Sequence, residues 1–468
     1  MLTALIVLPA VAALMVYPAR PLVARWVAVL AAVADLALAT GALTAPPESV
    51  PWIPTLGLGY DLKVDGLAYF LVVLAPLVTA LALLATSPRL ARLNEYSALM
   101  LALLAALQGV FLAGNLGLFY IFWEIMVLPA FFLVGRWGGD AGRRAAVKFL
   151  LYTLAGSLAM LLAVVTVAFS ASPPSFSFET LSQADLSEGA QLALVVFFFL
   201  GFAVKVPLLP LHGWQADTYE AAPAPAAALI AAVMSKAGVY GFLRVSLALF
   251  PIGMAKAAPY LGALALLTVL YGTLCALGQQ RMRRVLAYSS LAHVGMMMLA
   301  VFHLEPSALE GATLQMLAHG LTTAALFLLL GMLEDRDVPG DLSRVGGLAG
   351  PMPAFSLLLL LFAMASLGLP GLCSFPAELL MLYGVYQINP VSALMAMLGL
   401  VGAAWYMLRF FHRIANGSLR MDALKDLSWT EIGVLVPLAL LVVWIGLNPA
   451  PWAGLAGPVL QDMLGGVP

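Results

Sequence analysis

Apolar stretches of about 20 residues recur along this chain from Leu2 almost to the C-terminal end, separated by short charged or Pro/Gly-rich breaks. A helix needs about 20 apolar residues to cross the hydrocarbon core of a bilayer, which is about 30 Å thick. The stretches are continuous and do not alternate between apolar and polar residues, which favours helices over the strands of a closed barrel. The pattern therefore predicts an all-α polytopic membrane protein.

The number of apolar stretches predicts about fourteen transmembrane helices. Of the 468 residues, 63% are hydrophobic and 10% are charged, whereas about a quarter are charged in soluble domains. The longest polar breaks, residues 44–65, 171–190 and 334–350, are too short for a separate soluble domain. The predicted spans centre near Val11, Ala34, Val73, Leu104, Val127, Met160, Phe197, Met234, Leu266, Met296, Ala324, Phe362, Leu398 and Leu440.

The distribution of Lys and Arg predicts the orientation of the chain, because cytoplasmic loops are enriched in these residues. Placing both termini outside puts seventeen cations in the inner loops and three, Lys63, Arg244 and Lys256, in the outer ones. The inner set is Arg20, Arg25, Arg89, Arg92, Arg136, Arg143, Arg144, Lys148, Arg281, Arg283, Arg284, Arg336, Arg344, Arg409, Arg413, Arg420 and Lys425. We therefore expect a multi-pass membrane protein with both termini on the outer side.

Five charged residues fall inside the predicted spans: Asp35, Glu124, Lys205, Lys236 and Glu378. A charge at the centre of a bilayer costs roughly 2.5–3.5 kcal/mol on insertion scales, so each of them needs a partner or a function. The sequence offers neither a partner nor a helix break for Asp35. One interpretation of the other four is that they form structural ion pairs.

Helix breaks beside two of these charges favour a transport role instead. Lys205 is followed by Pro207 and Pro210, and Glu378 follows a Gly-Leu-Pro-Gly stretch at residues 368–371. Broken helices at matching places in two halves of a chain mark the ion site of many transporters. Because the breaks fall in spans seven and twelve, we expect two inverted five-helix repeats, spans 4–8 and 9–13. The predicted organisation is residues 1–95 (helices 1–3), 96–250 (first repeat), 251–415 (second repeat) and 416–468 (helix 14 and a tail).

Two histidines at membrane depth extend this set of titratable groups. His293 and His319 lie in spans ten and eleven, and nearby Ser and Thr hydroxyls can hold water between the groups. Imidazole titrates near neutral pH, which suits a proton relay. The candidate path for protons is Glu124, Lys205, Lys236, His293, His319 and Glu378.

Other classes of function have little support. The net charge is −1 and the cations are spread along the chain, so nucleic acid is not expected as a partner. The two cysteines, Cys275 and Cys373, cannot supply the four thiolates of an iron-sulfur cluster. The chain shows no dinucleotide or phosphate-binding glycine motif. We therefore expect no bound cofactor, no metal site and no redox active site.

Several motifs resemble those of the antiporter-like subunits of respiratory complex I. They are Phe-Tyr-Ile-Phe-Trp-Glu at 119–124, Trp-Gly-Gly at 137–139, Ala-Val-Lys-Val-Pro at 203–207, Pro-Leu-His-Gly-Trp at 210–214, Lys-Ala-Gly-Val-Tyr-Gly-Phe-Leu-Arg at 236–244, Ala-Tyr-Ser-Ser-Leu-Ala-His at 287–293 and Gly-Leu-Pro-Gly at 368–371. Glutamate at position 378 resembles the M type, since the related L and N types generally carry lysine there.

The resemblance implies roles for the candidate residues. Glu124 and Lys205 correspond to a proton-loading pair, and Lys236, His293 and His319 to a central hydrophilic axis. It also implies a subunit of an NADH:quinone oxidoreductase, whose NADH, FMN, iron-sulfur clusters and quinone bind to partner subunits. The expected neighbours are membrane lipids and other membrane subunits, especially the L and N types. The chain departs from the family at residues 214–220, where a Pro before Asp217 and a His soon after it are missing.

Two alternatives remain open from the sequence. Related subunits occur in Mrp-type Na⁺/H⁺ antiporters and in membrane-bound hydrogenases, where a similar path is driven differently. A non-pumping structural subunit would use the same charges only to hold helices together.

Overall fold

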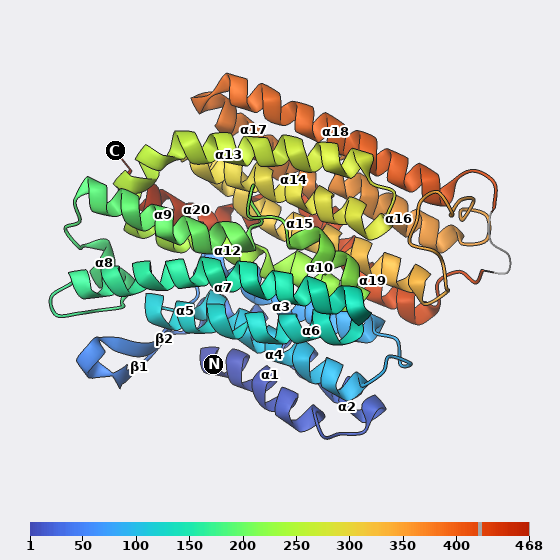
Figure 1. Ribbon diagram of the computed structural model, residues 1–468, viewed down its shortest axis with the longest axis horizontal. Helices are drawn as coiled ribbons and strands as arrows, with labels where there is room; N and C mark the ends of the chain where they lie inside the picture. Colours follow the sequence, from blue (N-terminus) through green and yellow to red (C-terminus); the bar gives the residue numbers. More distant parts are fainter. Residues whose placement is uncertain (420–423, 468) are drawn as a thin grey trace.

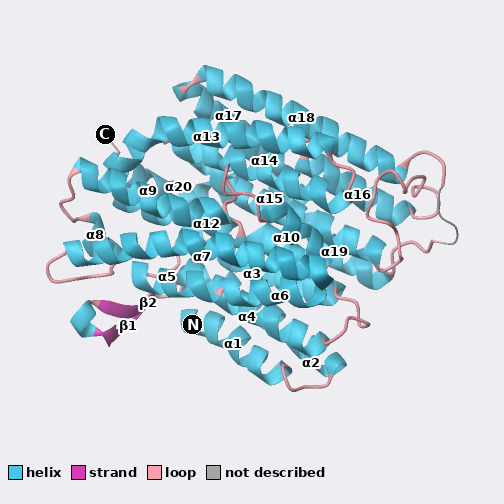
Figure 2. Ribbon diagram, viewed as in Figure 1, coloured by secondary structure: helices cyan, strands magenta, loops and turns pink. Residues whose placement is uncertain are grey.

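A computed structural model describes residues 1–419 and 424–467, so the predicted inner cation Arg420 lies outside the described residues. The helices run side by side along one direction (Figure 1), and Figure 2 shows that strands make up only one small hairpin. Among the described residues, twelve helical segments are long and apolar enough to cross a membrane. Two shorter apolar helices accompany them. The predicted polytopic helical fold is confirmed, while the count of fourteen and the inverted repeats stay predictions.

The N-terminal part of the chain forms a helical group and the hairpin. Its elements are α1 (Leu2–Val16), α2 (Pro21–Thr40), β1 (Glu48–Ile53), β2 (Leu58–Leu62), α3 (Gly66–Ala85), α4 (Leu93–Leu112), α5 (Leu116–Ile125), α6 (Val127–Trp137), α7 (Gly139–Ser170) and α8 (Phe178–Ser182). The antiparallel pairing of β1 with β2 lies in the break at 44–65, where we expected only a loop. The pairing provides hydrogen-bond partners for the backbone of this polar segment. The sequence did not indicate the strands because they are too short to show a clear alternation of apolar and polar residues.

The middle of the chain contains the first helix break. The elements are α9 (Glu188–Lys205), α10 (Gln215–Ala221), α11 (Ala224–Leu229), the π-helical segment Ile230–Met234, α12 (Lys236–Gly241), the π-helical segment Phe242–Leu247 and α13 (Pro251–Gly278). Helix α9 ends at Lys205, and the chain stays non-helical until Gln215, as Pro207 and Pro210 predict. The two π-helical segments on either side of α12 were not expected; such segments often occur at functional sites.

The C-terminal part contains the second break. Its elements are α14 (Met282–His303), α15 (Pro306–Glu334), α16 (Pro353–Ser366), α17 (Ser374–Ile388), α18 (Pro390–Ala415), α19 (Trp429–Leu447) and α20 (Ala450–Leu464). Residues 367–373 separate α16 from α17, and Gly368 and Gly371 within them have positive φ. Both predicted helix breaks are therefore present.

Burial divides the helices into a central and a peripheral set. The span Ala224–Leu247 is wholly buried, and α14 and α15 are 94% buried, whereas only a third of α18 is. The loops rich in Arg between α3 and α4, α13 and α14, and α15 and α16 lie at one end of the bundle, on the right in Figure 1; we call it the cation-rich end. The chain ends lie toward the opposite end (Figure 1).

Candidate functional site

Four of the predicted site residues lie in a continuous series at the centre of the bundle. They come from four different elements: Lys236 from α12, His319 from α15, His293 from α14 and Glu378 from α17. Lys236 Nζ lies 2.7 Å from His319 Nδ1, and the two imidazole rings are 5.4 Å apart between centroids. His293 Nε2 lies 3.7 Å from Glu378 Oε1. No member is more than 6% exposed, so the series is enclosed by the protein.

Lys236 is held at one end of this series by polar atoms of its own helix. Its Nζ donates to the carbonyl oxygen of Ala231 at 2.8 Å and lies 3.4 Å from Ser235 Oγ. Ala231 belongs to the π-helical segment that precedes α12. The ammonium group thus has two oxygen partners and one imidazole nitrogen, which offsets part of the cost of burying it.

His293 is the residue whose geometry says most about proton binding. Its Nδ1 lies 2.8 Å from the carbonyl oxygen of Ser289, and its Nε2 lies 2.9 Å from that of Ser366. Ser366 ends α16, so the helix break leaves its carbonyl free to accept. A neutral imidazole has one N–H, whereas donation to both carbonyls requires the doubly protonated ring. The site can therefore hold a second proton on the ring between two carbonyl acceptors, with the Glu378 carboxyl group 3.7 Å from Nε2.

The conformation of the second break places Glu378 close to the backbone at Gly368. Gly368 has a φ of +77°, and a Cβ built there would lie 2.1 Å from Glu378 Oε2. An L-residue is disfavoured in this region of φ, and its side chain would displace the carboxylate. The sequence indicated the break, but it gave no sign that a glycine lies directly against Glu378.

Gly368→Ala is expected to lower the stability of the folded subunit by at least about 1–2 kcal/mol, the cost of a left-handed conformation for an L-residue. The measurement is the apparent melting temperature of the purified host complex, followed through this subunit. Gly433→Ala in α19 serves as the control and should leave the melting temperature unchanged, because an added Cβ there would meet nothing within 4 Å. Equal melting temperatures for both variants would contradict the role assigned to Gly368.

Lys205 lies apart from this series. It is 1% exposed, and its Nζ lies 5.0 Å from the centroid of the Trp123 ring, a cation–π contact. Within residues 1–419 and 424–467, Nζ has no hydrogen-bond partner. Gly238 lets α12 approach the broken end of α9, since a Cβ there would lie 2.3 Å from Val206 Cγ2. The structure thus packs the helices of the two lysines together without joining their side chains.

Glu124 is half-buried on α5, and its charge acts on Lys205 through space. Within the described residues, neither Lys205 Nζ nor Glu124 Oε1 has a hydrogen-bond partner, so the two side chains are not in contact. The hydroxyl of Tyr120 also interacts with Glu124. The predicted loading pair is therefore close but not in contact in this structure.

Asp35, which the sequence left unexplained, has a partner that we did not identify. It is fully buried in α2, and Gln108 Nε2 on α4 donates to its Oδ2 at 3.0 Å. The same amide nitrogen donates to the carbonyl oxygen of Val72 on α3, also at 3.0 Å. A single glutamine within an apolar span was the available signal. These contacts place Asp35 in the N-terminal helical group, outside the central series.

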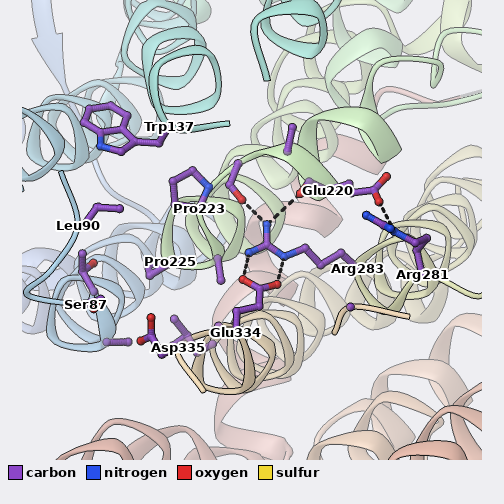
Figure 3. A pocket seen from close by; sticks show the side chains of 18 residues that line it. Ser87, Leu90, Trp137, Glu220, Pro223, Pro225, Arg281, Arg283, Glu334 and Asp335 are labelled. Carbon is purple, nitrogen blue, oxygen red and sulfur yellow. Dashed lines mark hydrogen bonds and ion pairs between the residues drawn. The ribbon is translucent and has the colours of Figure 1, made fainter. Parts of the chain in front are cut away.

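The cation-rich end carries a polar cavity of about 460 Å³ where α10, α11 and α15 meet. Figure 3 shows Arg283 at its centre, with Glu334 on one side and the chain at Glu220 on the other. Arg283 Nε donates to Glu334 Oε1 at 2.6 Å, and Nη1 donates to the carbonyl oxygens of Glu220, at 3.1 Å, and Ala222. This network fixes the short link from α10 to α11 and hence the position of α10.

Comparisons with known proteins identify the family of this chain. The family described as NADH:quinone oxidoreductase/Mrp antiporter, TM, matches residues 113–404. NADH-quinone oxidoreductase subunit M of Rhodobacter capsulatus is 36% identical over 96% of this chain and 91% of its own length. The subunit M of Escherichia coli K12 is also 36% identical, over 86% of this chain and 82% of its own.

Solved structures show the same fold. A chain of respiratory complex I from Thermus thermophilus superimposes with a TM-score of 0.93 and 31% identity over 99% of both chains. A chain of the Mrp complex from Dietzia superimposes with a TM-score of 0.89 over 99% of this chain and 97% of that chain; at 20% identity this shows the fold alone. The expected resemblance is confirmed: the chain belongs to the NADH:quinone oxidoreductase/Mrp antiporter transmembrane family.

Proposed function

We propose that this chain is the proton-translocating membrane subunit of an NADH-quinone oxidoreductase of the M type. The observation that carries the proposal is the enclosed series Lys236, His319, His293 and Glu378, in which a base, two imidazoles and an acid follow one another across four helices. Such groups are expensive at membrane depth and are retained there for ion or proton movement. The two relatives described above are named for the same subunit.

Proton transfer along the series follows from the contacts. The Lys236 ammonium gives a proton to His319 Nδ1 along their 2.7 Å contact. The hydroxyl of Thr323, 3.2 Å from His319 Nε2, takes part in passing the proton from one ring toward the other. His293 then holds it against the carbonyls of Ser289 and Ser366 and releases it from Nε2 to Glu378.

Glu124 and Lys205 control loading at the other end in this proposal. An opposite charge favours the ammonium form of lysine, and separation from that charge favours release of the proton. Glu124 lies near a short interruption between α5 and α6, at Met126, where a small movement changes its distance from Lys205. Quinone reduction in partner subunits supplies the energy for that movement.

The proposal also assigns the surroundings of the chain. NADH, FMN, iron-sulfur clusters and quinone bind to partner subunits, and antiporter-like subunits of the L and N types are the lateral neighbours. The apolar outer faces of α7, α13 and α18, which are only about a third buried, fit lipid and such neighbours. The chain lies in the bacterial inner membrane, with the cation-rich end facing the cytoplasm and both termini outside.

A subunit of an Mrp-type antiporter is the second candidate, because the fold of such a subunit is closely similar. The test uses inverted membrane vesicles containing the native complex that holds this chain. We expect NADH to drive proton uptake at a rate that does not depend on sodium. Proton movement that needs a sodium gradient and ignores NADH would replace the proposed function with antiport, and no proton movement under either condition would leave a structural subunit.

A further inference from the structure

We propose that protons reach Lys236 from the cation-rich end along one face of α10, through Gln215 and Tyr219 and then the hydroxyl of Ser235. The proposal rests on the function proposed above and adds the route by which Lys236 regains its proton.

Two polar side chains on the inner face of α10 are buried and have polar atoms without a hydrogen-bond partner in the described part of the chain. Gln215 is 2% exposed and Tyr219 is 0% exposed, and their spacing of four residues places them on one side of the helix. Gln215 Nε2 and the Tyr219 hydroxyl make no hydrogen bond of good geometry within the described residues. Buried polar groups in this condition are rare in proteins and indicate a functional role or bound water.

The Tyr219 hydroxyl lies between Gln215 and the helix of Lys236. It lies near the side chains of Gln215 and Ser235, without the geometry of a hydrogen bond to either. Ser235 Oγ in turn lies 3.4 Å from Lys236 Nζ and donates to the carbonyl oxygen of Ala231 at 2.8 Å. A hydroxyl group both accepts and donates a proton, so Tyr219 and Ser235 can each transfer a proton toward Lys236. In this route the amide of Gln215 orients the Tyr219 hydroxyl. The line ends on the lysine that begins the central series.

The opposite face of α10 carries charges and borders the cation-rich end. Asp217 accepts from Lys148 and Arg284, both at 2.9 Å, and Glu220 accepts from Arg281 at 2.7 Å. These side chains line a second cavity, which shares Trp137, Glu220 and Arg281 with the cavity in Figure 3. Helix α10 therefore presents charged side chains to the cavity and neutral polar side chains, Gln215 and Tyr219, to the protein interior.

The test uses Tyr219→Phe, which removes the hydroxyl and keeps the ring, in inverted vesicles containing the native complex. We expect NADH-driven proton uptake per assembled complex to fall roughly fivefold, which corresponds to a transfer barrier higher by about 1 kcal/mol. Tyr219→His, whose imidazole also accepts and donates, should restore most of the rate. The matched control is Tyr96→Phe: Tyr96 on α4 is equally buried, and its hydroxyl likewise makes no hydrogen bond of good geometry within the described residues, but it lies near Thr86 and Ala226 and off this line.

The outcomes separate the route from the function. Wild-type uptake in Tyr219→Phe, together with loss of uptake in Lys236→Met, would overturn the route and leave the proposed function standing. Wild-type uptake in both variants would overturn the proposed function itself. Equal losses in Tyr219→Phe and Tyr219→His, with less complex assembled, would assign Tyr219 to packing and also overturn the route.

Discussion

Lys236→Met is expected to abolish NADH-driven proton uptake, with a loss on the order of 100-fold or more, while the complex still assembles. Lys236 Nζ lies within hydrogen-bond distance of both Ser235 Oγ and His319 Nδ1, so its removal separates the loading side from the histidines. A positioned proton donor typically contributes 10²–10⁴-fold to the rate of a transfer step. Methionine fills a similar volume without leaving a charge unpaired, so the packing around α12 should be retained.

The measurement for Lys236→Met is the initial rate of proton uptake in inverted vesicles, divided by the amount of complex on a native gel. Lys256→Met is the control, because Lys256 is an exposed lysine that pairs with Glu188 near the start of α13. It should retain the wild-type rate. A normal rate per complex in Lys236→Met would remove Lys236 from the path, and normal uptake alongside poor assembly would support a structural role instead.

Glu378→Gln is expected to produce the second large effect, again a loss on the order of 100-fold in proton uptake. Glutamine has nearly the same shape but cannot bind and release a proton, so it removes the proton acceptor that lies 3.7 Å from His293 Nε2. A proton on His293, between the carbonyls of Ser289 and Ser366, then has no acid to pass to. Assembly should change little, since Gly368 still accommodates the side chain.

Proton uptake per assembled complex again tests this expectation, now with Glu188→Gln as the control. Glu188 is the exposed partner of Lys256, so the same chemical change there should have no effect. Glu378→Asp is a useful third variant, because it keeps the acid but shortens its reach. If Glu378→Gln retained full proton uptake, the Glu378 carboxyl group would not bind and release the transported proton.

The features that could be predicted from the sequence are those that depend on the residue types within a short stretch of chain. Prolines after Lys205 and glycines before Glu378 indicate helix breaks, and the structure ends α9 and α16 at those places. The charges in apolar spans indicated the candidate site residues directly. Four of them, Lys236, His293, His319 and Glu378, lie in one series, as a relay requires.

The features that could not be predicted depend on contacts between helices far apart in the sequence. No local pattern indicates that the carbonyl of Ser366 meets His293, 73 residues away, or that Gln108 meets Asp35. The π-helical segments around α12 have no sequence signature of the kind that proline provides. The relay face of α10 was missed for a related reason: Gln215 and Tyr219 are unremarkable polar residues until their burial is known.

The central claim is that buried Lys, His and Glu side chains of this chain carry protons. It is tested most directly by the number of protons taken up per NADH oxidised by proteoliposomes that contain the purified complex with Lys205→Ala. Lys205 is suited to this test because its Nζ has no hydrogen bond to lose within the described residues; the substitution removes the titratable group and its contact with the Trp123 ring. The account predicts a lower ratio than for the wild-type complex, or no proton-coupled turnover at all; a wild-type ratio at a wild-type rate would contradict it.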